Sequence, residues 1–552
     1  MRIYIYILLI LSPYFVLSQD LKTTEINVVE GLQVSVPEAN KLNVKASFQD
    51  TSKIDKTQDY SFINKFLFTK FDTRPLLAAK IKKNLLYKSN IGNVNVALGN
   101  KSYRFGNINY SGRLKDSFVY GLGIILNNHD YHTKEYDYNV VRKNQSVRLH
   151  AKSILPNTIV TSYVSLENIE NDHGASHDEK TKYTYSELSV LFNSRNNQKN
   201  NLQYSSELII KDLNQQVENY IGFNTDLTKT INNFPFNLSI EFNNYLNYKN
   251  HSSSRNIQKS DVKILDVSPS ISLEEKGFTF NLGFNLGIDM SDGNAADIFP
   301  LIEINKELVD NVVNLTLGID RYDYRNTLSS LSLENPYIHS FGLNTGISND
   351  TLDYLHALET TDIYEAFISL DNKLSSNEIL NFNLAYGKLL NLNYFDIEPV
   401  FVPDNFRFGV NYIDTWQLRI EGVYKRKFNN IIAMYLGANY KWFSEEVPHK
   451  TNLEANMSVP ITFGEKIRFI PSFEYIGGRK YSFPSGLFIE PPQIDIISLD
   501  DRYLANFEIY YSYSEKLDFS IRINNILDDQ KPFWYGYEEI GFNFNLGLNY
   551  IF

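Results

Sequence analysis

Two histidine-containing segments carry the residue types that metal chemistry would need. The first holds His173 and His177 together with three acidic residues, Asp172, Asp178 and Glu179. The second holds His129 and His132 with four further polar residues, Asp130, Tyr131, Glu135 and Asp137. Imidazole and carboxylate groups at such spacings can coordinate a divalent cation. Both segments fall between runs of alternating hydrophobicity, so we interpret them as solvated loops and predict no metal site.

Enzymatic chemistry finds no support elsewhere in the chain. We find no serine nucleophile elbow, no HExxH pair and no Walker loop. The 552 residues include nine His and no Cys, so an exported chain would have neither disulfides nor a thiolate metal site. The net charge of -11 argues against nucleic acid as a partner, because that binding relies on clustered Lys and Arg. We predict that the protein is not an enzyme and uses no cofactor.

The first eighteen residues predict a cleaved signal peptide. Arg2 precedes a short apolar run over residues 3–10, and Val16 and Ser18 occupy the positions that a signal peptidase reads. A membrane-anchor helix is the alternative, but the run is shorter than the ~20 residues that a spanning helix needs. No later apolar stretch approaches that length, so membrane residence would have to use β-strands.

The last strand shows the alternation that such strands require. Phe542, Phe544 and Leu546 share one face of an extended chain, whereas Asn543 and Asn545 share the other. An apolar face toward lipid and a polar face toward a lumen are typical of a transmembrane barrel. A soluble sandwich strand gives the same pattern once, so the repetition of the pattern along the chain decides between the two.

The repetition predicts an all-β fold, an antiparallel up-and-down transmembrane barrel of about 22 strands within a range of about 16–24. The expected strands cover residues 91–99, 102–111, 118–127, 145–154, 158–167, 182–193, 202–211, 216–226, 234–246, 262–274, 277–288, 298–306, 312–320, 362–370, 378–387, 411–424, 430–441, 451–459, 466–475, 501–513, 517–525 and 540–552. Composition agrees, because 38 Tyr and 37 Phe accompany a mean hydropathy of -0.30, unlike any helical membrane protein.

Connection lengths predict the orientation. Residues 155–157, 275–276 and 514–516 are short connections that we expect on the periplasmic side, and residues 128–144, 168–181, 247–261, 320–361, 388–401 and 476–500 are long ones that we expect outside the cell. Both termini would then be periplasmic. Charged residues that alternate with the apolar ones along the strands are expected to face the lumen. They include Arg419, Glu421, Glu508, Asp518 and Arg522.

The end of the chain resembles TonB-dependent receptors. The resemblance rests on about thirty residues, with the turn residues 525–528, the aromatic loop residues 534–537 and the closing Tyr550-Ile551-Phe552. It implies an outer-membrane receptor barrel, with Tyr550 and Phe552 as the signal read by the barrel-assembly machinery. The usual Gly-Arg before the last strand is Gly541-Phe542 here, which makes the match partial.

The chain also departs from that family before the barrel. Residues 19–87 are too few for the globular plug of a receptor, so we expect an extended periplasmic or lumenal arm there and the barrel over residues 88–552. Within the arm, Glu25, Ile26, Val28 and Val29 resemble a TonB box, which pairs with its energising partner by strand addition. An ordinary linker is the alternative interpretation.

Two functions remain open from the sequence. The resemblance implies solute uptake or a gated channel across the outer membrane, with lipid, the assembly machinery and TonB or another envelope protein as partners. The missing plug favours the alternative, a structural or partner subunit of an outer-membrane assembly, secretion or surface-display complex.

Overall fold

The computed structural model describes residues 92–115, 117–134, 138–172, 180–195, 202–213, 218–231, 234–253, 256–290, 295–338, 359–398, 407–484 and 494–552. The expected signal peptide, the arm with Glu25, Ile26, Val28 and Val29, and the pair His173 and His177 lie outside these residues. Among the described residues, no helix has the length and hydropathy that a bilayer crossing requires.

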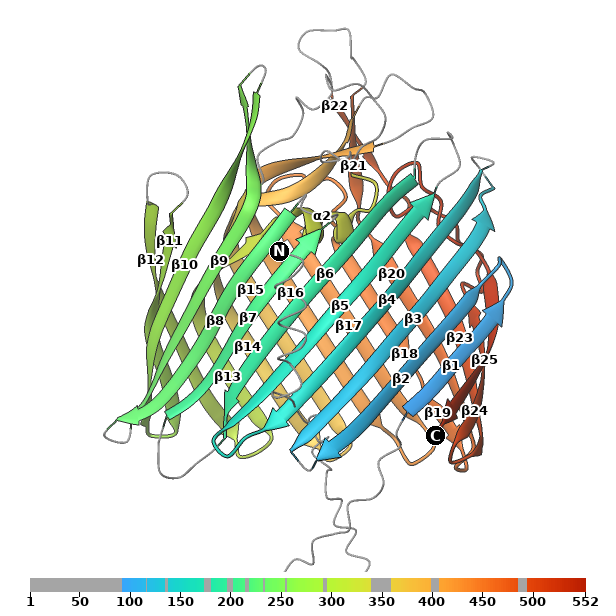
Figure 1. Cartoon of the computed structure of the whole chain (residues 1–552), viewed down its shortest axis with the longest axis horizontal. Coiled ribbons are helices and arrows are strands. Elements are labelled where there is room, and N and C mark those ends of the chain that lie inside the picture. Colours follow the sequence, from blue (N-terminus) through green and yellow to red (C-terminus); the bar gives the residue numbers. More distant parts are fainter. Residues whose placement is uncertain are drawn as a thin grey trace, which may run out of the picture. The chain divides into compact units, whose positions relative to one another are not determined.

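Most of the described chain forms strands that cross one sheet in sequence order (Figure 1). The strands and the short helix of the described residues are β1 (Gly92–Gly99), β2 (Arg104–Lys115), β3 (Phe118–His132), β4 (Asn139–Ile154), β5 (Thr158–Asp172), β6 (Lys180–Ser194), β7 (Leu202–Leu213), β8 (Glu218–Ile231), β9 (Phe234–Ser253), β10 (Asn256–Glu275), β11 (Phe278–Asp289), β12 (Ala295–Val309), β13 (Val313–Arg325), α2 (Leu328–Glu334), β14 (Thr360–Ser375), β15 (Glu378–Glu398), β16 (Arg407–Lys427), β17 (Ala433–Phe443), β18 (Leu453–Ser458), β19 (Ile461–Phe463), β20 (Ile467–Gly477), β21 (Lys480–Pro484), β22 (Ile494–Ser498), β23 (Arg502–Ser514), β24 (Leu517–Asn524) and β25 (Asn543–Ile551).

The sheet closes on itself into a barrel. Each strand pairs antiparallel with the next, and β25 pairs with β1 through contacts such as Leu548 with Val96. The sheet has 23 named strands, and β18 and β19 are two parts of one crossing because both pair with β20, so the barrel has 23 - 1 = 22 strands. Strands β21 and β22 form a separate hairpin. The predicted fold and strand number are confirmed.

The alternation of side chains divides the sheet into an apolar outer face and a polar inner face. In β25, Phe544 is 42% and Leu546 is 56% exposed, whereas the intervening Asn543 and Asn545 are buried. Register transfers the same division to neighbouring strands, because Leu546 pairs with Ile521 and Asn545 pairs with Arg522. The outer face therefore presents the apolar band that a transmembrane barrel needs toward lipid.

The two ends of the barrel differ in their connections. We call the end with β10–β11 and β23–β24 the short-turn end, because residues 276–277 and 515–516 join those strands. Phe552 also lies at this end, where its backbone exchanges hydrogen bonds with Gly92. The opposite end carries the connections of β13–β14, β20–β23 and β24–β25, and we call it the long-loop end.

Several connections predicted as loops are in fact strands that extend beyond the predicted ends. Strand β3 runs to His132 and β4 begins at Asn139, so His129 and His132 lie in strand rather than in a loop. Strands β9, β10, β15 and β16 are likewise extended at the long-loop end. Backbone pairing needs no apolar side chains, so a ladder can continue where the alternation of hydrophobicity, which marks the lipid band, has ended.

Candidate functional site: the loop-packed mouth of the barrel

A hydrophobic core lies at the long-loop end, inside the barrel wall. We call it the mouth core; its buried members are Tyr183, Leu213, Tyr245, Val262, Ile264, Leu328, Leu331, Tyr337, Ile338, Phe395, Ile397, Phe408, Val410, Tyr481, Leu499, Trp534 and Tyr537. Helix α2 and the hairpin β21–β22 contribute to it, together with the connection between β24 and β25. Figure 1 shows α2 near the upper ends of the wall strands, with β21 and β22 labelled above it.

The mouth core joins distant parts of the wall. Tyr183 belongs to β6 and Tyr245 to β9, whereas Phe395 and Phe408 belong to β15 and β16. Since β6 and β16 are ten strands apart in a ring of 22, one packed cluster connects walls that are almost diametrically opposed. The loops therefore form a structure that crosses the mouth.

Aromatic contacts hold the loops together. Tyr337 stacks on Tyr537 with ring centroids 3.6 Å apart, and Trp534 packs against Phe395 at 5.1 Å and Phe408 at 5.5 Å. Tyr481 of the hairpin stacks on Tyr535 at 4.2 Å. Aromatic pairs contribute about 0.5–1.5 kcal/mol each beyond the area that they bury. Cohesion of the mouth core therefore depends on the last loop, which supplies Trp534, Tyr535 and Tyr537.

Helix α2 is anchored at both ends by charged side chains. Glu218, which is buried, accepts hydrogen bonds from the backbone N–H groups of Leu328 at 2.5 Å and Ser329 at 3.2 Å. A carboxylate at a helix N-terminus satisfies free N–H groups and interacts favourably with the helix dipole. At the other end, Lys450 approaches Glu334 to 2.5 Å. These contacts fix the position of α2 against β8 and the β17–β18 connection.

Arg142 of β4 connects the wall to two loops. Its guanidinium lies 3.1 Å from Glu539 and donates to the Tyr337 hydroxyl at 2.9 Å. Burial alone would raise the pKa of Glu539, but the hydrogen bond and charge of Arg142, together with the charges of Arg502 and Arg479, hold that pKa below its usual range. Burial also raises the pKa of Tyr337 to about 12, against the opposing effect of Arg142. At neutral pH this contact is a charged pair with a neutral phenol.

Two buried basic side chains lie near the root of the hairpin. Arg479 is almost fully buried and donates to the carbonyl oxygens of Phe533 at 2.8 Å and Asp500 at 3.0 Å. Burial and the nearby Arg502 lower the pKa of Arg479 to about 10. His449 has its Nδ1 at 2.8 Å from the Phe395 carbonyl, and burial lowers the pKa of His449 to about 4. The His449 imidazole is therefore neutral at physiological pH and donates to that carbonyl.

The wall itself has an opening in its backbone ladder near the mouth, which we call the seam. Pairing between β12 and β13 ends at Ile302 and Ile319. Toward the mouth, β12 continues to pair with β11 as far as Ala295, and β13 continues to pair with β14 as far as Arg325. The two edges therefore separate along the last residues of both strands, on the side of the mouth from which β13 leads into α2.

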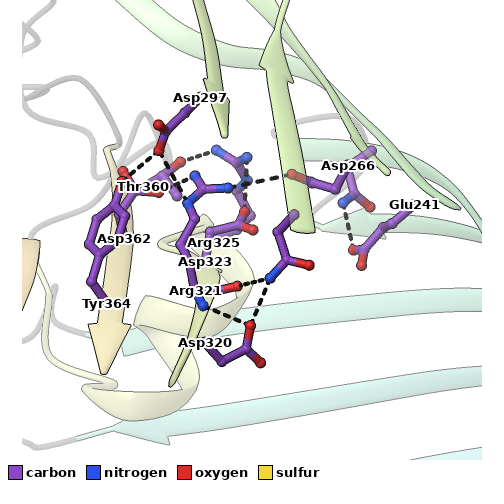
Figure 2. A network of polar contacts seen from close by, with 12 residues as sticks. Glu241, Asp266, Asp297, Asp320, Arg321, Asp323, Arg325, Thr360, Asp362 and Tyr364 are labelled. Atoms are coloured by element: carbon purple, nitrogen blue, oxygen red, sulfur yellow. Dashed lines mark hydrogen bonds and ion pairs between the residues drawn. The ribbon is translucent and has the colours of Figure 1, made fainter. Parts of the chain in front are cut away.

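Side chains bridge the seam in place of the backbone (Figure 2). Arg321 of β13 lies 3.6 Å from Asp297 of β12, 3.9 Å from Asp266 of β10 and 2.6 Å from Asp362 of β14. The Tyr364 hydroxyl donates to Asp297 at 2.7 Å. One nearly buried guanidinium thus joins carboxylates on both sides of the seam, an arrangement suited to the planar donor fork of arginine.

The charges predicted to face the lumen are held in two groups on the inner face. Arg419 lies 3.1 Å from Glu365 and 3.8 Å from Glu421. Arg522 lies 3.6 Å from Glu508 on the neighbouring strand, and Asn549 donates to Asp518 at 3.3 Å. Register places Arg522 beside the inward Asn545 and Asp518 beside Asn549. The wall strands bring these residues together in ion pairs and hydrogen bonds.

The other predicted residues lie elsewhere. Tyr550 and Phe552 lie on the outer face at the short-turn end, where their rings stack with centroids 6.4 Å apart. His129 packs on Tyr103 with ring centroids 4.7 Å apart, and the His132 Nδ1 lies 3.0 Å from the Asn139 Oδ1. Among the residues that the structure describes, no group of three potential ligands could hold a metal ion.

Sequence reasoning missed the residues that build the mouth. Arg142, Glu218, Arg321, His449 and Arg479 are each single polar residues in segments that otherwise resemble polar loops or strand ends. Their partners are up to several hundred positions away, as with Arg142 and Glu539. The aromatic run Phe533-Trp534-Tyr535 was the one available signal, because a large apolar cluster in a loop implies something to pack against.

Comparison with known proteins identifies the fold and nothing narrower. No family model and no curated protein sequence matches the chain. Solved structures do match: the copper transporter OprC, with TM-score 0.60 and 9% identity, covers 84% of this chain and 80% of its own. The ferric-catecholate import receptor Fiu from E. coli K12 matches with TM-score 0.58, 11% identity and 84% and 81% coverage. The siderophore receptor PirA from Acinetobacter baumannii matches with TM-score 0.59, 12% identity and 84% and 80% coverage.

The likeness extends over the barrel. Each of the three comparisons covers 84% of this chain, which takes in most of its 22-stranded antiparallel barrel. At such low identity the likeness establishes the fold of an outer-membrane barrel, as the sequence resemblance implied.

Proposed function

We propose that this protein is an outer-membrane uptake barrel or gated channel whose mouth core is the gate. The observation that carries the proposal is the packed cluster that joins β6 and β9 to β15 and β16 across the mouth. A ring of 22 strands encloses a lumen wide enough to be plugged in known transporters. A gate made of its own loops would supply the obstruction that such a lumen needs.

The fold of the similar structures favours transport over catalysis. OprC is a copper transporter, and Fiu is an import receptor for ferric catecholates. Those cargoes belong to those proteins, and for this chain we propose only the class, uptake of a solute through a gated lumen. No catalytic role is proposed.

The orientation follows from the connections. We propose that the long-loop end faces outward and that the short-turn end, with Phe552, faces the periplasm, as the length rule for outer-membrane barrels predicts. Residues 19–87 would then be an arm of the periplasm or lumen. Glu25, Ile26, Val28 and Val29 would offer a strand to TonB or another envelope protein, and Tyr550 and Phe552 would be read during assembly.

The alternative is a structural subunit of an outer-membrane complex. Besides the missing plug, one structural feature favours it: the mouth core is tied to the wall by partly buried ion pairs, such as Arg142 with Glu539, that suit a permanent closure as well as a gate. In that case the barrel would never conduct and would bind its partners through the arm or the loops.

Reconstitution in planar lipid bilayers separates the two functions. We expect discrete conductance steps from the full chain, larger or more frequent after residues 20–85 are deleted and after Arg142→Ala loosens the mouth core. The transport proposal fails if none of the three proteins conducts while the full chain co-purifies stoichiometrically with other envelope proteins. Folding of each variant is checked by the heat-dependent shift of barrel proteins on gels.

A further inference from the structure

A cavity of about 280 Å³ lies beside the mouth core, on the inner face of β3, β4 and β5. Asn127, Arg142 and Asn171 line it, one from each strand, and Ile540 of the last loop covers it. Register pairs Asn127 with Asn144 and Arg142 with Asn171, so the strand residues share one face. Arg142 also contacts Glu539 and Tyr337, which identifies that face as the inner one. The volume is close to the lower end of the ~300–1,000 Å³ typical of small-molecule sites.

The wall of this cavity carries polar groups without protein partners. The Asn127 Oδ1 and the His129 Nδ1 are buried and lack a partner among the described residues. Asn171, which is 6% exposed, adds a further side-chain amide to the lining. Leaving such a buried group without a hydrogen bond is unfavourable, because it has lost its water partners. Two such atoms at one cavity call for an explanation.

The charges at the cavity are already neutralised. Arg142 is paired with Glu539 at 3.1 Å, and Lys143 is paired with Glu170 at 2.6 Å. An anionic ligand would have to compete with these carboxylates, and a metal ion would find amides and an imidazole but no free carboxylate. An apolar ligand would leave the free amides unsatisfied. The remaining polar groups are neutral and include both donors and acceptors.

We propose that this cavity binds a small neutral polyol, with the size and chemistry of a single sugar ring. A hydroxyl group donates and accepts at once, as an asparagine amide does, so a ring of hydroxyls can satisfy Asn127, Asn171 and His129 together. Ile169 and Ile540 offer apolar contact for the C–H face of such a ring. This proposal rests on the proposed uptake function, for which it names a class of solute. Binding of the solute can nevertheless be measured without transport.

Saturation-transfer NMR on the purified full chain in detergent micelles tests the site. The neutral probes are glucose, galactose, mannose and myo-inositol, and glucose 6-phosphate is the charged counterpart. We expect at least one neutral probe to bind saturably, and glucose 6-phosphate to bind no more tightly than glucose. Asn171→Leu should raise the Kd by tenfold or more, which corresponds to the loss of about 1.4 kcal/mol.

The control is Asn168→Leu, the same substitution on the same strand at a position of opposite parity, where Asn168 accepts from Thr184. It should leave binding unchanged. If Asn171→Leu does not assemble, Asn127→Leu takes its place with the same expectation.

The proposal is overturned if no neutral probe binds, if the phosphate binds more tightly, or if Asn171→Leu and Asn168→Leu behave alike. If the protein conducts but binds none of the probes, the sugar site is refuted and the uptake function stands. If a probe binds, and Asn171→Leu abolishes that binding, but the protein never conducts, the site stands and the uptake function is refuted.

Discussion

The phenol rings of Tyr337 and Tyr537 lie parallel, with an interplanar angle of 4° and 3.6 Å between their centroids. Tyr337 belongs to the connection after α2, and Tyr537 belongs to the last loop of the chain. Two loops from separate parts of the wall therefore meet at one contact inside the mouth. If the mouth opens, this contact must break, so the residues that support it are where substitutions should act.

Arg142→Ala should loosen the mouth. The substitution leaves the Glu539 carboxylate without its partner and the Tyr337 hydroxyl without its donor, and removing one partner of such a pair costs roughly 2–5 kcal/mol. We expect faster hydrogen exchange in the last loop, residues 525–541, measured by mass spectrometry. Arg148→Ala, on the same strand and parity, is the control and should leave that exchange at the wild-type rate. Equal exchange in the two variants would show that Arg142 does not hold the loop.

Arg321→Gln should open the seam between β12 and β13. The amide cannot reproduce the contacts to Asp266, Asp297 and Asp362, and these carboxylates would then repel one another. Because the natural chain has no Cys, Phe299→Cys provides a single reporter at the seam, where Phe299 packs on Tyr364 at 5.2 Å. We expect thiol labelling to accelerate about tenfold, which corresponds to ~1.4 kcal/mol. Arg419→Gln removes an ion pair elsewhere on the wall and should not change the rate; an effect of equal size there would refute the bridging role.

Acid should destabilise the mouth core through His449. Its pKa is about 4 in the folded core and near 6.5 in an exposed histidine, so the opened mouth binds the proton more tightly. The neutral His449 therefore stabilises the closed mouth fully above pH 6.5. As the pH falls toward 4, the equilibrium constant for closing decreases by up to about tenfold per pH unit. Limited proteolysis of the loops should therefore be faster at pH 5.0 than at pH 7.0.

His449→Asn should remove that dependence. The backbone of His449 has a φ of 60°, a conformation that Asn tolerates, and an amide can donate to the Phe395 carbonyl in place of the imidazole. The interval between pH 7.0 and 5.0 isolates this group from Glu539, whose pKa lies below its usual value. An unchanged pH slope in His449→Asn would exclude His449 as the sensing group.

The division of the sheet into two faces predicts opposite results for neighbouring residues of β24. Ile521, on the outer face, is 40% exposed, and Ile521→Arg would place a charge toward lipid at a cost of roughly 2–4 kcal/mol near the midplane. Ser520 lies on the inner face, and Ser520→Arg should be tolerated in a wet lumen. Urea unfolding of the two variants in lipid vesicles measures the difference. Equal stabilities would contradict the assignment of the faces.

The strands could be predicted because their pattern is local. All 22 crossings follow from the period of two, since lipid on one side and water on the other require alternation within each strand. The ends of β3, β4, β15 and β16 could not be predicted, because above the lipid band the backbone ladder continues with polar side chains. The repeated alternation was sufficient to predict the fold but carried no information about the mouth.

The mouth depends on pairs that no local pattern reveals. Arg142 meets Glu539, and Glu218 meets Leu328, only after the barrel has closed. The seam at Arg321 is similarly invisible, because the alternation of β12 and β13 continues where their pairing has ended. The lumen charges, by contrast, could be proposed from parity alone.

A disulfide across the mouth tests the gating claim most directly. Ile338 and Phe408 form a backbone bridge between the connection after α2 and β16, and residues paired in this way lie within the Cα distance that a disulfide requires. In planar bilayers, the Ile338→Cys/Phe408→Cys protein should be silent when oxidised and should conduct after reduction with dithiothreitol, while each single variant should conduct under both conditions. Conductance that is the same before and after reduction would contradict the account that the loops of the mouth core are the gate.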